Sequence, residues 1–164
     1  CSKLKVILCE PYLDKQIESK LSKKKIFSSR EIPVRADVYI FIDVLEHIME
    51  PLSYLQRVIK SAKINSYFIF GNCFYPCIKC HLPSTFYLRH TFHLAALLMG
   101  LSYVDKVKDA PYMKIYQLTS RSSINTNNVR YITKVTSLLI TPCIFGIRVL
   151  SKLKKIIKKL ISGI

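Results

Sequence analysis

The chain has 164 residues, of which 50% are apolar and 22% are charged. This length and composition fit one folded domain and exclude a disordered chain. Lysine and arginine total 26, against 10 aspartates and glutamates. Residues 110–164 hold ten of the basic residues and none of the acidic ones, so the positive charge is concentrated in the C-terminal third.

Six cysteines do not indicate a disulfide-stapled scaffold, because three of them fall within residues 73–80 and a chain of this length buries a core without staples. We therefore expect a reducing compartment. No uninterrupted run of about 18 apolar residues, the length of a membrane-spanning helix, occurs in the sequence. These features predict a cytoplasmic protein, either free or peripheral at a membrane surface.

The N-terminal part alternates between short apolar runs and amphipathic stretches. Residues 4–9 are apolar and β-branched and are closed by Glu10 and Pro11, which predicts a strand. Residues 12–25 carry apolar side chains at a spacing of four, which predicts a helix. Residues 36–43 are almost continuously apolar, as expected for a central strand covered on both faces.

The same alternation continues along the chain. The predicted elements are a helix over residues 51–63, a covered strand over 67–70, a helix over 85–99, and strands over 101–107 and 112–118. Pro51 suits a first helical turn, and Gly100 suits a helix end. Only four residues separate the last two strands, which forces them to pair antiparallel.

This order of elements predicts an α/β fold whose open, mostly parallel sheet ends in an antiparallel hairpin. We assign residues 1–118 to this domain and residues 119–128 to a polar linker. Residues 129–164 are predicted to form a basic amphipathic helical extension, with two helices parted at Thr141 and Pro142.

Three predicted strand ends carry polar residues, and in open α/β sheets ligands bind at the carboxyl ends of the strands. These ends are Glu10 with Pro11, residues 43–47, and residues 71–73. A carboxylate just past a strand can accept hydrogen bonds from both hydroxyls of a ribose. Glu10 fits this role, and a solvated acid at a strand end is an equally good interpretation of its position.

The segment Asp43-Val44-Leu45-Glu46-His47-Ile48, followed by Glu50-Pro51 and an amphipathic helix, resembles a motif of class I S-adenosylmethionine-dependent methyltransferases. The antiparallel hairpin is a second resemblance, because that family inserts its last strand antiparallel. The resemblance covers about residues 3–118 and implies a Rossmann-like sheet, here lacking its first strand. It further implies S-adenosylmethionine as cofactor. The cofactor-binding residues would be Glu10, Pro11, Asp43, Val44, Leu45 and Glu46.

The family's glycine-rich loop, which follows its first strand, has no counterpart in this sequence. The four glycines are Gly71, Gly100, Gly146 and Gly163, and none lies in such a loop. The simplest interpretation is that the first strand and its loop precede Cys1 in a longer protein. The rival interpretation is a degenerate domain that no longer binds the cofactor. In either case we expect this chain alone to bind S-adenosylmethionine weakly or not at all.

The acceptor side of the proposed site follows from the same resemblance. Residues 81–92 resemble the family's segment after the fifth strand, which implies that Asn72, His81 and Arg89 face the acceptor. The resemblance leaves the acceptor open among lipid-linked, saccharide and small hydroxylated molecules. Methyl transfer needs at most one base, and His47 or His81 suits that catalytic role because imidazole titrates near neutral pH.

The cysteine-rich segment contains residue types that can bind zinc. Cys73, Cys77, Cys80 and His81 offer four soft ligands within nine residues. Structural zinc sites usually join two close pairs across a longer loop, and Pro76 makes convergence of these four awkward. The sequence therefore predicts no metal.

The C-terminal tail is a separate feature. Within residues 143–164, aliphatic residues recur every three or four positions and five lysines fill the other side. Such a helix lies at an anionic membrane surface, or it docks on the domain or on a partner; the pattern leaves both open. A nucleic-acid partner is disfavoured, because aliphatic rather than aromatic residues accompany the lysines. The alternative function is thus a non-catalytic interaction domain that works through its tail.

Overall fold

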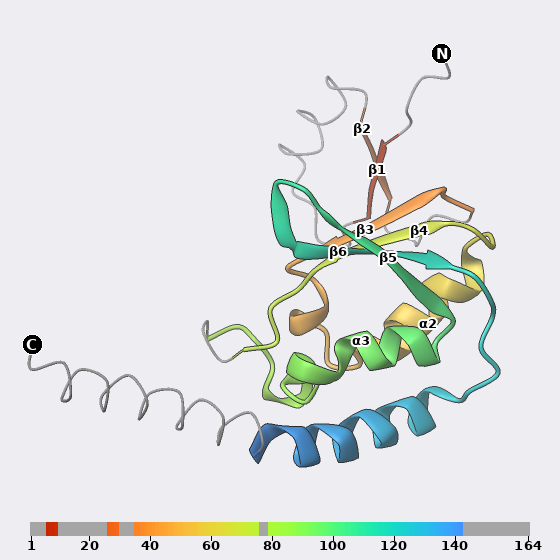
Figure 1. Ribbon diagram of the computed structural model, residues 1–164. Coiled ribbons are helices and arrows are strands. Elements are labelled where there is room, and N and C mark those ends of the chain that lie inside the picture. The colour runs from red at the N-terminus through yellow and green to blue at the C-terminus, as the bar shows by residue number, and fades with distance from the viewer. Residues whose placement is uncertain (1–5, 10–25, 30–34, 76–78, 143–164) are drawn as a thin grey trace, which may run out of the picture.

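The computed structural model describes residues 6–9, 26–29, 35–75 and 79–142 (Figure 1). Its labelled elements are β1 (Val6–Cys9), β2 (Ile26–Ser29), β3 (Val38–Ile42), η1 (Leu45–His47), α2 (Pro51–Ser61), β4 (Tyr67–Gly71), η2 (Pro83–Thr85), α3 (Leu88–Leu98), β5 (Leu101–Val107) and β6 (Ala110–Leu118). A further helix covers residues 126–142 and is blue in Figure 1.

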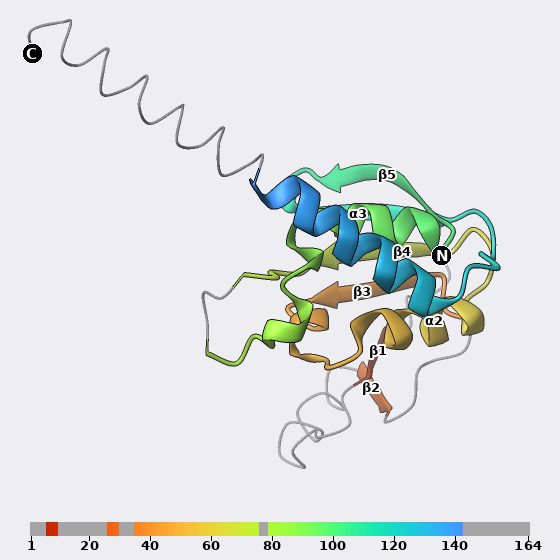
Figure 2. The same ribbon diagram turned by 90° about the horizontal axis from the view of Figure 1, so that it is seen from below.

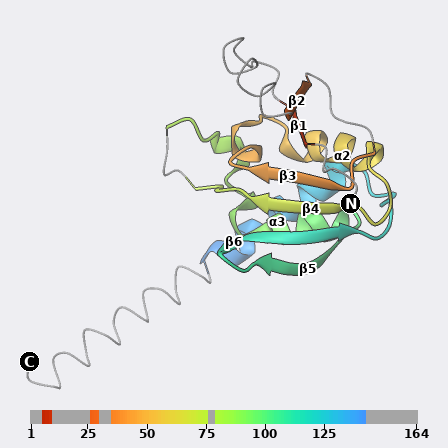
Figure 3. The same ribbon diagram turned by 90° about the horizontal axis from the view of Figure 1, so that it is seen from above.

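Four of the strands form a mixed sheet in the order β3-β4-β6-β5. β3 and β4 are parallel, whereas β6 lies antiparallel between β4 and β5. β1 and β2 pair in parallel as a separate sheet, and Figures 2 and 3 place them on the side of β3 that faces away from β4. The predicted α/β class and antiparallel hairpin are confirmed. The four-stranded sheet is mixed rather than mostly parallel, because β6 separates β5 from β4.

One face of this sheet carries the hydrophobic core, and we call it the covered face. It presents Tyr39, Phe41, Phe68, Phe70 and Tyr116, all of which are buried. The apolar sides of α2 and α3 pack against these rings through a set of buried residues: Leu52, Leu55, Val58, Ile59, Leu88, Ala95 and Ala96. The rings also stack on one another, with 5.2 Å between the centroids of Phe41 and Phe70.

The other face, which we call the open face, presents Val38, Ile40, Ile42 and Tyr67. The three β3 residues are 47%, 60% and 45% exposed. The prediction of a β3 covered on both faces is therefore wrong within the described residues. Alternate side chains of a strand point to opposite faces, and among the described elements only helices on one side supply a covering layer.

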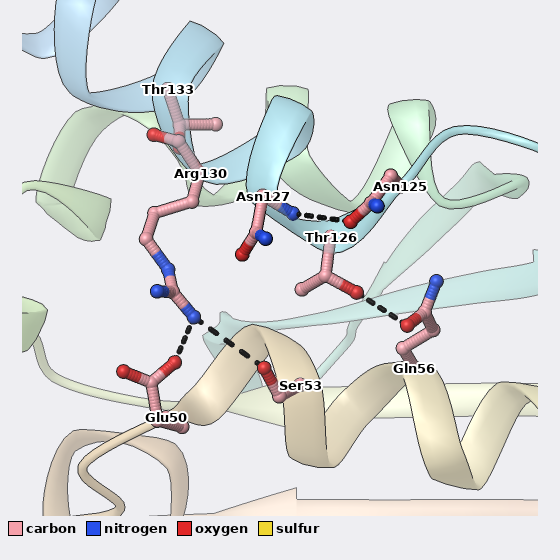
Figure 4. A network of polar contacts seen from close by, with 8 residues as sticks. All are labelled: Glu50, Ser53, Gln56, Asn125, Thr126, Asn127, Arg130 and Thr133. Atoms are coloured by element: carbon pink, nitrogen blue, oxygen red, sulfur yellow. Dashed lines mark hydrogen bonds and ion pairs between the residues drawn. The ribbon is translucent and has the colours of Figure 1, made fainter.

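The helix over residues 126–142 forms a further layer, packed against α2 (Figure 4). Its Arg130 guanidinium contacts the Glu50 carboxylate and lies 3.4 Å from the Ser53 hydroxyl, and the Thr126 hydroxyl donates to the side-chain oxygen of Gln56. Val129 is fully buried beside these contacts. The helix thus begins inside the predicted linker and docks on the domain. The tail segment 143–164 lies outside the described residues.

Element boundaries shift modestly from the predictions. Pro83 starts the single turn η2, so α3 begins at Leu88 rather than at residue 85. β6 begins at Ala110, which leaves Lys108 and Asp109 as the hairpin turn. The sequence did not predict β2, and the helix predicted over residues 12–25 lies outside the described residues. Within the described part of the chain, no helix combines the length and apolarity that crossing a membrane requires.

Candidate functional site

The carboxyl ends of β3 and β4 lie side by side, because the two strands are parallel and paired in register. The Asp43 amide extends this pairing by donating to the Gly71 carbonyl at 3.0 Å. Asn72, the residue after β4, reaches across to the loop that follows β3. Its side-chain oxygen accepts hydrogen bonds from the amides of Val44 and Leu45, at 3.1 and 3.0 Å. Asn72 therefore fixes the loop over residues 43–47, which we call the strand-end loop.

Residues of the strand-end loop divide into exposed and buried side chains. Asp43 and His47 are exposed, Val44 is half-buried, and Leu45 and Glu46 are fully buried. One carboxylate oxygen of Glu46 accepts the Cys73 amide at 2.7 Å, and the other is buried without a hydrogen-bond partner among the described residues. Of the expected cofactor-binding residues in this loop, Asp43 and Val44 therefore reach solvent. Leu45 and Glu46 instead pack beneath the loop and support it.

Two of the expected cofactor residues cannot be placed relative to this loop. Glu10 and Pro11 lie outside the described residues. Their parent strand β1 pairs with β2 on the side of β3 away from β4. A crevice shared by positions 10 and 43 therefore stays a prediction.

A cavity of about 180 Å³ opens beside Asn72, between α3 and the strands β4 and β6. Aromatic rings form its apolar walls: Phe70, Phe74, Phe92, Tyr112 and Tyr116. Its polar lining comprises Asn72, Arg89, His90, His93 and Lys114. Two of the three predicted acceptor residues, Asn72 and Arg89, thus border one cavity, whereas His81 is not among its lining residues. No acidic residue lines it, so its electrostatic field is positive.

Arg89 is held at the cavity by stacking. Its guanidinium carbon lies 3.6 Å from the centre of the Tyr75 ring, a cation–π geometry. Its Nε atom is buried and makes no hydrogen bond with any described residue. A buried donor without a partner costs folding free energy, so the stacking on Tyr75 and the surrounding packing must hold Arg89 in place.

Lys114, His93 and Tyr116 line the cavity although no sequence pattern predicted them as site residues. The strand register explains them, because Lys114 and Tyr116 pair directly opposite Phe70 and Phe68 and so point to the covered face. Tyr116 hydroxyl and His93 Nδ1 are 2.9 Å apart. Burial raises the pKa of Tyr116 to about 12, and nearby Tyr103 adds to the shift. The strand register brings Lys114 and Tyr116 to the cavity, and the packing of α3 on the sheet brings His93 there.

The two candidate bases come together away from the cavity lining. The rings of His47, in η1, and His81, just before η2, have their centroids 5.0 Å apart. His81 is only 4% exposed and its Nδ1 lies 2.7 Å from the Tyr75 carbonyl. His47 is exposed, and its Nδ1 lies 3.2 Å from the Cys80 carbonyl.

Comparisons of the chain with protein-family models, with curated proteins and with solved structures found no match. The likeness of residues 43–48 to a methyltransferase motif therefore stays a prediction. The strand-end loop, the Asn72 side chain and the basic cavity are the features from which a function can be built.

Proposed function

We propose that this chain is a methyltransferase domain dependent on S-adenosylmethionine, with the strand-end loop bordering the cofactor and the basic cavity taking the acceptor. The observation that carries the proposal is the double position of Asn72. Its side chain holds the loop at residues 44–45, and the same residue lines the cavity. A donor at the loop and an acceptor in the cavity would therefore meet at one residue.

The strand order gives independent support. β6 lies antiparallel between β4 and β5, at the end of the sheet opposite β3. This arrangement fits the inserted last strand that the resemblance predicts. The exposed Asp43 carboxylate lies at the carboxyl end of β3, where it can accept hydrogen bonds from the hydroxyl or amino groups of a cofactor.

Methyl transfer requires mainly that the methyl donor and the acceptor be held in the correct relative position. The sulfonium of bound S-adenosylmethionine supplies an already activated methyl group, so the protein aligns the acceptor with it and excludes water. The aromatic side chains that line the cavity would exclude water from the acceptor. His47 and His81 are the predicted residues to take a proton from the acceptor. Because neither lines the cavity, a substitution at each tests whether the acceptor reaches them.

The cavity also narrows the class of acceptor. Its volume of about 180 Å³ is below the roughly 300–1,000 Å³ of sites that enclose a drug-sized ligand, so it fits a small molecule or one end of a larger one. Arg89 and Lys114 supply positive charge without any acidic neighbour in the lining. The proposed acceptor therefore carries a carboxylate or phosphate beside an apolar group that packs on the rings.

A nuclear magnetic resonance titration with S-adenosylhomocysteine tests the cofactor site. Because the sequence holds no glycine-rich loop, we expect weak binding, seen as shifts of the amide signals of residues 43–47 at millimolar ligand. The substitution Asp43→Asn should reduce these shifts, whereas Asp109→Asn, an exposed aspartate in the β5–β6 turn, should leave them unchanged. Shifts confined to other regions of the chain, or shifts of residues 43–47 that Asp43→Asn leaves unchanged, would overturn the proposal.

A membrane-surface role is the second candidate, and the helix over residues 126–142 favours it. Exposed apolar residues lie along one side of this helix: Tyr131, Ile132, Val135, Leu138 and Leu139. At 100° per residue they occupy the side opposite the buried Val129 and Thr133, which pack on the domain. An apolar stripe within a region that has ten basic and no acidic residues suits an anionic lipid surface.

Sedimentation with vesicles separates this candidate from docking on a protein. We expect the chain to bind phosphatidylserine-containing vesicles and to be released by high salt, because lysine attraction is screened. Removal of residues 143–164 should weaken the binding, and the double substitution Leu138→Ser and Leu139→Ser should weaken it further. Equal sedimentation of all variants, or none with the intact chain, would exclude the membrane role.

A further inference from the structure

We propose that His47, Cys80 and His81 form a binding site for a zinc-type divalent ion. Their ligand atoms all lie within 4.8 Å of one another. His47 comes from η1 after β3, whereas Cys80 and His81 come from the segment between β4 and η2. One thiolate and two imidazoles are ligands that Zn²⁺ prefers, and three protein ligands leave the fourth tetrahedral position for water or another donor.

The hydrogen bonds of the two rings orient them for metal binding. A carbonyl oxygen only accepts hydrogen bonds, so Nδ1 of His47 donates to the Cys80 carbonyl and Nδ1 of His81 donates to that of Tyr75. Each neutral ring then carries its lone pair on Nε2, the ring atom that would ligate a metal. Metal-ligating histidines usually have their other nitrogen held in this way.

The two segments are joined by bonds that do not involve any ion. The Leu82 amide donates to the Glu46 carbonyl at 3.0 Å, and the Cys73 amide donates to the Glu46 carboxylate at 2.7 Å. Zinc bonds of about 2.0–2.3 Å place tetrahedral ligand atoms roughly 3.5 Å apart. The exposed side chains of Cys80 and His47 can close this difference by rotation, while the buried His81 stays in place.

This site differs from the one that the sequence analysis rejected. The crowded spacing within residues 73–81 argues against a metal held by that segment alone, but His47 lies 33 residues before Cys80 and supplies a ligand from a distant segment. The proposal does not rest on methyl transfer. A bound ion would engage both imidazoles as ligands, so zinc binding would exclude His47 and His81 as the base while leaving a methyltransferase function intact.

Zinc binding to the full 164-residue chain is measured by competition with a chromophoric chelator under reducing conditions. We expect one ion per chain. Loss of a residue that hydrogen-bonds to a metal ligand lowers metal affinity about 10–100-fold. Loss of a ligand itself should lower the affinity more. We therefore expect Cys80→Ser and His47→Gln each to lower the zinc affinity at least about a hundredfold. Both residues are exposed, so these substitutions leave the core intact. Cys73→Ser is the matched control, because its backbone amide still donates to Glu46.

Cobalt substitution provides a second readout. Co²⁺ bound through Cys80 should show a thiolate-to-metal charge-transfer band that is lost in Cys80→Ser and retained in Cys73→Ser. Absence of zinc binding by the intact chain would overturn the proposal, as would unchanged affinity in Cys80→Ser or a cobalt band that depends on Cys73. None of these measurements involves S-adenosylmethionine, so failure here is distinct from failure of the proposed methyltransferase function.

Discussion

The two faces of the four-stranded sheet differ sharply although the same strands form both. On the covered face, Phe41, Phe68 and Phe70 are buried under α2 and α3, and the helix over residues 126–142 adds a layer beyond them. On the open face, Ile40 is 60% exposed. The candidate cavity lies on the covered face, where side chains are held rigidly enough to shape a site.

The largest expected effect is the loss of a ring from the covered face. Phe68 is fully buried and its ring stacks between those of Tyr39 and Phe41. We expect Phe68→Ala to lower the free energy of unfolding by about 3–5 kcal/mol, because it leaves a cavity in a packed core. Urea denaturation measures the change. A loss below about 1 kcal/mol would mean that this face is not the core.

A methyl group added at each of two glycines should destabilise the fold to different extents. Gly100 has a φ of 90° and caps α3, and a Cβ there would lie 2.0 Å from the Ser120 carbonyl oxygen. We expect Gly100→Ala to cost about 2–3 kcal/mol. Gly71 is the control, since its Cβ would first meet the half-buried Met113 side chain on the open face. Thermal melting should show a much smaller loss for Gly71→Ala, and equal losses would contradict the picture.

The buried Tyr116 of the covered face should make the free energy of unfolding depend on pH in the alkaline range. Because burial raises the pKa of Tyr116 to about 12, its phenol stays neutral in the fold while the unfolded chain ionises near pH 10. The stability that depends on this group is present below pH 10 and is lost as the pH rises towards 12. Tyr116→Phe should flatten that decline only in part, because the pKa of Tyr87 is also raised to about 12 by burial. Urea midpoints along the pH series measure it, and Tyr67→Phe on the open face is the comparison.

The smallest effect is expected on the open face. Ile40→Thr should change the free energy of unfolding by less than about 0.5 kcal/mol, because the side chain already meets water. Urea denaturation of the full chain measures it. A loss above about 1 kcal/mol would show that some segment outside the described residues covers this face and would erase the contrast between the two faces.

Local patterns were sufficient to predict most of the sheet and its helices. Pro51, Gly100 and the short β5–β6 connection marked element ends that the structure confirms within a few residues. The exposure of Ile40 could not be predicted, because a continuous apolar run looks the same whether one or both faces are covered. Contacts between distant segments, such as His47 with His81 or Lys114 opposite Phe70, depend on topology and register that no local pattern contains.

The position of β3 at the margin of the four-stranded sheet has a consequence for handling the protein. Its outer backbone amides and carbonyls meet no strand of that sheet, and its outward side chains are Val38, Ile40 and Ile42. The β1–β2 pair lies on that side of β3 without pairing to it, and an unpaired, hydrophobic margin of this kind is a template on which another polypeptide adds a strand. Concentrated preparations should therefore self-associate through β3, and Ile40→Lys should keep the molecules apart.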